Sequence, residues 1–339
     1  MDKFFTDWEG PWVTTDFAYE IARKVLNNQI FFQRLSQYDD YLSYIVKKED
    51  YEPGDTLKIL APFIIASEVT SQNLRDISRD LVTFVPHSRQ AVKSLDYMPV
   101  VISTSYQQFL EVSAGALGIK EHLYGTELRI DDYRVDEEDK ELVKRAVGDI
   151  AALPEIEVRS DMTKDELPEA SEQSVDWLDD FFWKRLRHTS FEPVLEKVKA
   201  MGGKRKREVV ERYMDDFNYN EVIAIGDSIS DYAMLDFVRD NGVALSFNGN
   251  EYALDHSNVA VISDTAFGEA AVVDAFAKKG IDGVIDVVKN KRTELLNPQI
   301  AKNLSTTKFY WLNDVDLDAV IVESEHMRKK LRGGAGHLG

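Results

Sequence analysis

The sequence contains no cysteine among its 339 residues. This absence excludes disulfide bonds, thiolate zinc sites, iron–sulfur clusters and cysteine nucleophiles. The six histidines show neither HxH nor HExxH spacing, so zinc-dependent hydrolysis has no support. Ser103 is not part of a G-x-S-x-G elbow, which removes the serine hydrolase interpretation. Any chemistry must therefore come from carboxylates, hydroxyls, amines and bound ions.

Long hydrophobic runs are also missing, and the longest, residues 57–66, has about half the length of a membrane span. The N-terminal segment carries Asp2, Asp7 and Glu9 where a signal peptide needs cations and an apolar stretch. We therefore expect no membrane insertion and a cytoplasmic protein. With 60 acidic and 41 basic residues, the net charge of -19 would repel nucleic acid. A small anionic substrate would need locally placed positive charge.

The length and the 44% hydrophobic fraction predict an ordinary globular chain of about two domains. A short apolar segment, KFFT, is followed by carboxylates and Gly10-Pro11, and this pattern indicates a strand that runs into a turn. Further apolar runs alternate with helical patterns and predict buried strands; they span residues 97–103, 221–225, 242–246 and 259–262. This alternation predicts an α/β fold built on a doubly wound parallel sheet.

Helical patterns fill most of the remaining chain. The block from about residue 15 to 94 is divided by Pro53-Gly54 and Pro86, and further helices are predicted over 107–117, 141–153 and 175–186. The composition of 131–187 is acidic, but its helix around 177–183 is rich in tryptophan and phenylalanine. We expect these aromatic side chains to dock on the core, with a partner surface as the alternative.

Polar side chains follow the predicted strands, at the sheet edge where parallel sheets bind ligands. They comprise carboxylates, hydroxyls and one lysine at a helix start: Asp7, Glu9, Ser103, Thr104, Ser105, Lys204, Asp227 and Asp231. Carboxylates can hold a hard cation, while hydroxyl and ammonium groups can bind phosphate oxygens. The set therefore contains the parts of a phosphoryl-transfer site.

In order along the chain, DWEGP, VVIST, GGKRKREVV and GDSISDYAML resemble the four motifs of the haloacid dehalogenase (HAD) superfamily. The 23-residue step from Lys204 to Asp227 is similar to that of its phosphoserine-phosphatase-like branch, and it favours Lys204 over Lys206 as the site lysine. The stretch LGIKEHLYGTELRI also looks like that branch. The resemblance covers about 1–130 and 190–285. It implies a Rossmann-like core over 1–14, 91–130 and 188–290 and a helical cap over 15–90. Two segments lie outside the resemblance: an acidic insertion over 131–187, and a C-terminal extension over 291–339 with a flexible end.

The resemblance implies Mg²⁺-dependent hydrolysis of a small phosphorylated metabolite through an aspartyl phosphate. Asp7 would be the nucleophile, Glu9 the acid and base, and Lys204 a further catalytic residue. Ser103, Thr104 and Lys204 would bind the phosphate. The metal would be held by Asp7, the backbone carbonyl of Glu9, Asp227 and Asp231, with Asp231 ligating directly or through water.

Two departures from the superfamily pattern leave alternatives open. Glu9 stands where the family usually has aspartate, as in a minority of its phosphatases, and Pro11 replaces the usual threonine. The chain also looks similar to archaeal chains labelled as a subunit of an energy-converting hydrogenase. A weakly active or non-catalytic subunit of a larger assembly and a phosphomutase are therefore the alternatives to a hydrolase. A homo-oligomer or a complex partner also remains open.

Overall fold

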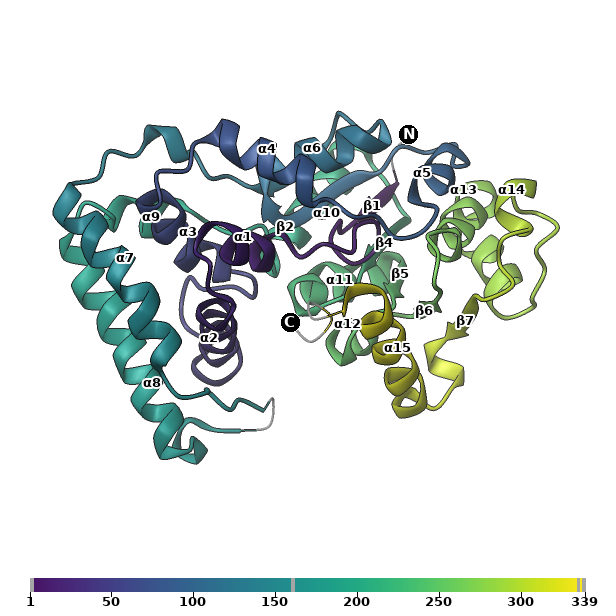
Figure 1. Ribbon diagram of the computed structural model, residues 1–339. Helices are drawn as coiled ribbons and strands as arrows, with labels where there is room; N and C mark the ends of the chain where they lie inside the picture. The colour runs from purple at the N-terminus through teal and green to yellow at the C-terminus, as the bar shows by residue number, and fades with distance from the viewer. Residues whose placement is uncertain (1–2, 160–161, 334–335, 337–339) are drawn as a thin grey trace.

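The centre of the molecule is a seven-stranded sheet with the order β3-β2-β1-β4-β5-β6-β7. The computed structural model describes residues 3–159, 162–333 and 336 (Figure 1). The strands are β1 (Phe4–Thr6), β2 (Val100–Tyr106), β3 (Leu123–Thr126), β4 (Val222–Gly226), β5 (Gly242–Phe247), β6 (Val259–Ile262) and β7 (Lys308–Trp311). All neighbouring strands are parallel except β6 and β7. The predicted α/β class is confirmed.

The order of the first six strands is that of a doubly wound sheet. From β1 the chain moves outward through β2 and β3, and it then returns to β4 on the other side of β1. Loops after β1 and β4 consequently leave the sheet in different directions. The gap between them, at the carboxyl ends of the strands, is the topological switch point where such sheets bind ligands.

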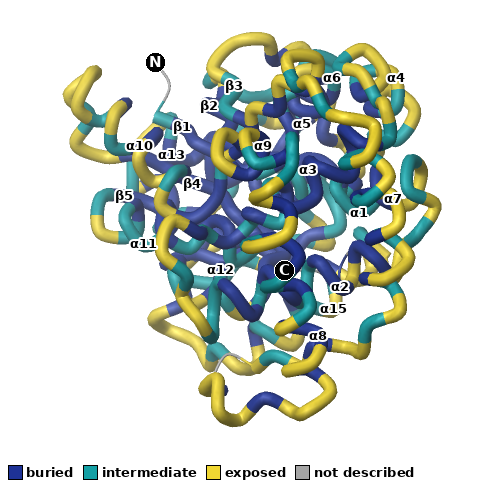
Figure 2. Tube along the Cα trace, turned by 90° about the vertical axis from the view of Figure 1, so that its left-hand side faces the viewer, coloured by how far each residue is buried: buried dark blue, intermediate teal, exposed yellow. Residues whose placement is uncertain are grey.

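The two faces of the sheet are both buried, which explains the continuous apolar runs of the sequence. In β1, Phe4 packs into the larger core cluster, whereas Phe5 packs on the opposite face with Val209, Val210 and Leu235. Successive side chains of a strand point to opposite faces, so each strand serves both layers. Figure 2 shows the strands in the buried interior of the molecule.

Helices cover both faces of the sheet. On one face lie α10 (Lys204–Phe217) and α11 (Tyr232–Asn241). On the other face lie α5 (Ser88–Lys93), α6 (Gln107–Leu117) and α13 (Phe267–Val288). The shorter α12 (Glu251–Asp255) follows β5, and α4 (Ser71–Leu81) packs on α6. The result is a three-layer α/β/α core.

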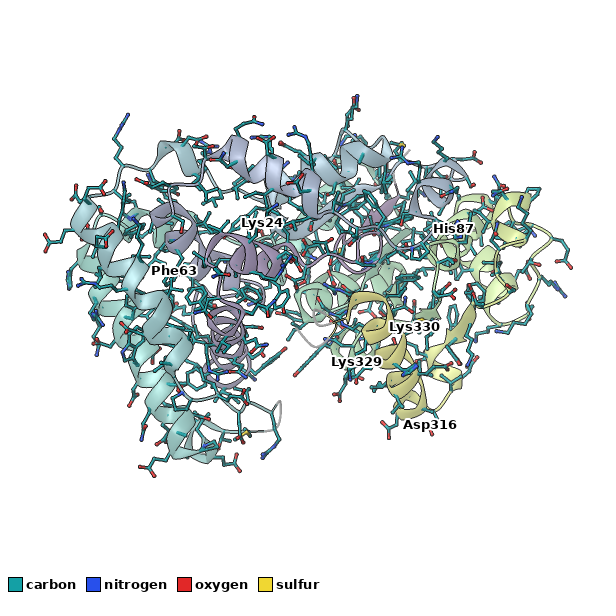
Figure 3. All side chains as sticks on the ribbon, in the orientation of Figure 1. Lys24, Phe63, His87, Asp316, Lys329 and Lys330 are labelled. Carbon is teal, nitrogen blue, oxygen red and sulfur yellow. The ribbon has the colours of Figure 1, made fainter. Side chains whose placement is uncertain are left out.

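Beside this core, a group of helices forms what we call the helical lobe. It comprises α1 (Phe17–Val25), α2 (Gln29–Asp40), α3 (Thr56–Ala66), α7 (Glu137–Ala152), α8 (Glu169–Asp180) and α9 (Glu192–Lys197). Helix α7 packs against α2 and α3, so segments 15–90 and 131–187 meet (Figure 1). Phe181 and Phe182 are fully buried and contact Phe63 of α3, which Figure 3 labels. This aromatic segment therefore docks within the chain, as expected.

The C-terminal segment adds structure that the sequence pattern does not predict. It contains α14 (Pro298–Ala301), strand β7 and α15 (Leu317–Arg332). Strand β7 pairs with β6 in the antiparallel direction and forms the edge of the sheet on that side. Strand β3, like β7, is not predicted by the sequence pattern. The expected flexible end falls largely on 334–335 and 337–339, outside the described residues. Within the described part of the chain, no helix is both long and apolar enough to cross a membrane.

Candidate active site

Asp7 is the first residue after β1, and the loop that follows it is fixed by buried tryptophans. The backbone N–H of Asp7 donates to the Ile225 carbonyl at 2.8 Å, which extends the pairing of β1 with β4. Trp12 Nε1 donates to Thr6 Oγ1 at 2.9 Å, and Trp8 Nε1 donates to Ser113 Oγ at 2.8 Å. Large buried side chains thus anchor the loop and hold Asp7 in the switch point.

The loop after β4 is held by one of its own carboxylates. Asp231 Oδ2 accepts hydrogen bonds from the backbone N–H groups of Asp227 at 2.9 Å and Ser228 at 3.1 Å. A Cβ atom on Gly226 would lie 2.5 Å from Asp231 Cβ, so only glycine allows this close approach. The tight turn places Asp227 beside Asp7.

Asp7, Asp227 and Asp231 form a buried carboxylate cluster, with one oxygen of each within 4.8 Å of the others. Gly10 makes room for it: its φ is +107°, and a Cβ atom there would lie 2.1 Å from Asp227 Oδ2. Asp227 Oδ1 is buried and has no hydrogen-bond partner among the described residues. Three hard oxygen donors with one unsatisfied atom fit a divalent cation such as Mg²⁺.

The lysine that contacts this cluster is Lys206, so the prediction of Lys204 is wrong. Lys206 is fully buried, and its Nζ lies 2.9 Å from Asp7 Oδ1 and 2.7 Å from Asp231 Oδ1. The Lys204 side chain is 70% exposed and faces Glu52 on the surface. Helix α10 begins at Lys204 after Gly203, so the inward position falls on its third residue. Burial alone would lower the pKa of Lys206, but Asp231 and Asp7 outweigh burial and raise it.

The carboxyl of Glu9 lies outside the cluster. Its Oε1 accepts from the Phe17 backbone N–H at 3.1 Å and from Ser105 Oγ at 2.8 Å. Burial, with repulsion from Asp16, raises the pKa of Glu9 to about 8 despite the hydrogen bond from Ser105. A carboxyl that keeps its proton at neutral pH can act as a general acid. Metal binding by the Glu9 backbone carbonyl stays a prediction.

The two hydroxyl residues predicted to bind phosphate differ in their surroundings. Ser103 is fully buried, lines the cavity beside Asp7, and its Oγ accepts from the Ser105 backbone N–H at 3.2 Å. Its own proton is thus available for an anion. Thr104 also lines the cavity, but its hydroxyl donates to the Met201 carbonyl at 3.2 Å. Ser103 is therefore the better placed of the two donors.

Two arginines from α15 reach the site, and neither is among the site residues predicted from the sequence. Arg328 contacts the Asp227 carboxylate and also donates to the Asp227 carbonyl at 3.0 Å. Arg332 Nη1 lies 3.0 Å from Asp227 Oδ2. Both arginines belong to one buried stripe of α15 with Val320 and Ser324, spaced by four residues. Cations at positions i and i+4 on the apolar face of a helix are unusual, and this pattern could have identified both arginines from the sequence.

A cavity of about 130 Å³ opens at the cluster and extends toward the helical lobe. On the sheet side it is lined by Asp7, Glu9, Ser103, Asp227 and Arg332. On the lobe side it meets Asp16, Phe32, Asp39, Asp40 and Thr56. Pockets for drug-sized ligands have roughly 300–1,000 Å³, so this cavity suits a small metabolite.

Comparison with known proteins identifies a relative of the whole chain. No protein-family model matches the sequence, and no curated protein matches it. The structure of gene product AF1437 from Archaeoglobus fulgidus is similar over 99% of this chain and 98% of that chain. The two share 37% sequence identity, with a TM-score of 0.85. The chain belongs to the AF1437 family.

The extent of this match shows which parts of the molecule the AF1437 family shares. Because the match covers 99% of the chain, it includes the helical lobe and α15 as well as the sheet. The match therefore extends over the acidic segment 131–187 and the C-terminal extension.

Proposed function

We propose that the protein is an HAD-like, Mg²⁺-dependent phosphatase that hydrolyses a small phosphate monoester through an aspartyl phosphate. The observation that carries this proposal is the buried contact of Lys206 with both Asp7 and Asp231, beside Asp227 at the switch point. This arrangement combines a carboxylate nucleophile, a fixed cation and oxygen ligands at one edge of the sheet. The helical lobe would act as the cap, and the protein would be cytoplasmic.

In the first step, a carboxylate oxygen of Asp7 attacks phosphorus as the bond from phosphorus to the alcohol oxygen breaks. Glu9 donates its proton to that oxygen, so the alcohol leaves neutral. The raised pKa of Glu9, about 8, keeps this proton available near neutral pH. Ser105 and the Phe17 N–H orient the Glu9 carboxyl.

In the second step, water attacks the phosphorus of the aspartyl phosphate, and Glu9, now ionised, takes a proton from it. The bond between phosphorus and the Asp7 oxygen breaks, which releases inorganic phosphate and restores both carboxyls. Lys206 and Ser103 would neutralise the phosphoryl oxygens in both steps. Such preorganised donors each contribute roughly 3–4 kcal/mol to the transition state.

The fit of the carboxylate cluster to a cation supports the metal requirement. Asp7, the Glu9 carbonyl and Asp227 would hold Mg²⁺, and Asp231 would do so directly or through water. The ion would supply positive charge to the transferring phosphoryl group. This charge offsets the long-range repulsion between an anionic substrate and a protein of net charge -19.

The decisive experiment measures phosphate release from a panel of phosphate monoesters by the purified protein, with and without Mg²⁺. We expect turnover that requires Mg²⁺ and is abolished in Asp7→Asn, together with beryllofluoride binding that the same variant loses. Asp149→Asn, which changes an exposed carboxylate on α7, is the matched control and should behave as wild type. Turnover by Asp7→Asn would overturn the mechanism. Transfer of the phosphoryl group to a second hydroxyl instead of water would identify a phosphomutase.

A further inference from the structure

We propose that Arg332 binds a second anionic group, a carboxylate or a phosphate, on the alcohol part of the substrate. The proposal rests on the hydrolase function given above and names the substrate class of the same site. It assigns a binding role to helix α15, which lies about 100 residues beyond the Asp227 loop in the sequence. Four features of the structure support it.

The first feature is the firm docking of α15. Ser324 Oγ is buried and donates to the Gly249 carbonyl at 2.6 Å, while Val320 packs with Leu254 and Ile262. Tyr310 of β7 donates to Glu323 at 2.6 Å on the neighbouring side of the helix. Gly249 belongs to the loop after β5, and its backbone approaches Asp227. The helix is therefore fixed to the same edge of the sheet as the site, and its arginines are preorganised.

The second feature is the charge of the cavity wall. Six carboxyl side chains line the cavity, namely those of Asp7, Glu9, Asp16, Asp39, Asp40 and Asp227. Among the described residues that line it, Arg328 and Arg332 are the only ones with cationic side chains; Lys206 contacts Asp7 but is not part of the lining. Within the described part of the cavity wall, an anionic group outside the reach of Lys206 and of the metal therefore meets an opposite charge at these two arginines.

The third feature is a free donor on Arg332. Its Nη1 lies 3.0 Å from Asp227 Oδ2, and its Nη2 lies 3.7 Å from Asp16 Oδ2. Its Nε is buried and has no hydrogen-bond partner among the described residues. A buried guanidinium N–H without an acceptor is costly, which indicates that a ligand supplies the acceptor. Arg328, in contrast, holds the Asp227 carbonyl and carboxylate and is a positioning residue.

The fourth feature is the place of Arg332 relative to the proposed acid. Arg332 and Glu9 line the same cavity, and Arg332 faces Asp16 at the start of α1. Lys206 contacts Asp7 and Asp231 instead. Because Glu9 protonates the leaving oxygen, Arg332 lies toward the leaving alcohol. A carboxylate or phosphate on that alcohol would pair with its planar donors.

Matched pairs of esters test this assignment, because the members of a pair differ only in the second anion. One pair is 2-phosphoglycolate and 2-hydroxyethyl phosphate, in which a hydroxymethyl group replaces the carboxylate. A second pair is propane-1,3-diol bisphosphate and 3-hydroxypropyl phosphate. The quantity compared is the ratio of kcat/KM within each pair, at saturating Mg²⁺. The two pairs together show whether the anion is a carboxylate or a phosphate.

We expect wild type to prefer, in at least one pair, the member that carries the second anionic group. Arg332→Met should reduce that preference roughly 10- to 100-fold, the usual worth of hydrogen bonds to a charged group. Arg332→Lys should retain part of the preference, because it keeps the charge but loses the planar donors. Lys330→Met, which removes an exposed cation from the same helix (Figure 3), should leave the ratio unchanged. Far-ultraviolet circular dichroism checks that each variant is folded.

An unchanged ratio in a folded Arg332→Met protein that still hydrolyses the esters overturns the proposal. An equal loss for both members of each pair also overturns it, because Arg332 would then act only through Asp227 or Glu9. Calorimetric binding of 2-phosphoglycolate to Asp7→Asn protein separates this proposal from the hydrolase function. Binding that needs both the carboxylate and Arg332, without turnover by wild type, would retain the anion site and discard the phosphatase.

Discussion

Lys206 Nζ lies 2.9 Å from Asp7 Oδ1, and both groups are buried. We therefore expect Lys206→Met to lower kcat by roughly 10²- to 10³-fold, in line with the loss of one preorganised donor. Removing one partner of a buried ion pair also costs about 3–5 kcal/mol of stability. For this reason Lys206→Arg, which keeps the charge, should be measured beside it. Lys204→Met is the matched control, since that side chain is 70% exposed. Equal losses in Lys204→Met and Lys206→Met would contradict our assignment of the site lysine.

The contacts of Glu9 predict an effect that depends on the leaving group. Glu9→Gln keeps the shape of the side chain but removes its proton, so hydrolysis of alkyl phosphates should slow by roughly 10²- to 10⁴-fold. p-Nitrophenyl phosphate has a leaving group that needs no proton. The first step of its hydrolysis should therefore slow much less in Glu9→Gln. Steady-state and burst kinetics with both esters provide the measurement. If Glu9→Gln lowers the burst rate by the same factor with both esters, Glu9 is not the general acid.

Gly10 gives a test of the close packing around Asp227. With φ at +107° and a Cβ position 2.1 Å from Asp227 Oδ2, Gly10→Ala should cost about 1–3 kcal/mol of unfolding free energy. It should also weaken Mg²⁺ binding, because Asp227 must move. Gly148→Ala is the opposite case, because this glycine lies inside α7 with open space around it. Alanine there should raise the free energy of unfolding by roughly 0.5–1 kcal/mol. Urea denaturation and calorimetry measure both effects, and a harmless Gly10→Ala would refute this view of the loop.

The cap side of the cavity predicts a pH dependence of stability. Burial raises the pKa of Asp39 from 3.8 to about 7, although Tyr51 donates a hydrogen bond to it. Between these two values the folded state binds the additional proton, so the free energy of unfolding falls as pH rises from about 4 to 7. Above pH 7 this loss is complete.

Asp39→Asn should remove that part of the pH dependence. At roughly 1.4 kcal/mol per pKa unit, the variant should gain up to a few kcal/mol relative to wild type at pH 8, and nothing at pH 4. The amide oxygen of the substituted side chain can still accept the Tyr51 hydrogen bond. Denaturation curves from pH 4 to 8, with Asp149→Asn as the exposed control, give the comparison. Parallel stability curves for wild type and Asp39→Asn would show that Asp39 is ionised at neutral pH.

The strands and the nucleophile loop were within reach of sequence reasoning because their signals are local. β6 occupies the predicted residues 259–262, and Asp7 and Asp227 directly follow runs of buried residues. Short β3 and β7, of four residues each, carry no such run. The choice of Lys206 over Lys204 depends on the helical phase that Gly203 sets at the start of α10, and spacing alone does not resolve it.

The arginines of α15 illustrate a different limit. Their partner, Asp227, is about 100 residues away, and a helix rich in Lys, Arg and Glu normally indicates a solvated surface. Only the four-residue spacing of Val320, Ser324, Arg328 and Arg332 marks a buried stripe. Without the fold, no local rule says which loop that stripe meets.

The docking of α15 also has a consequence for the order of folding. Contacts between residues far apart in sequence form late, because loop closure must precede them. Until α15 docks, Asp7, Asp227 and Asp231 have Lys206 as their only cationic contact among the described residues outside that helix. A refolding chain should therefore acquire its helical signal first and its competence to bind anions last. Ribosome-bound chains that still lack this helix would hold an open, strongly acidic cleft.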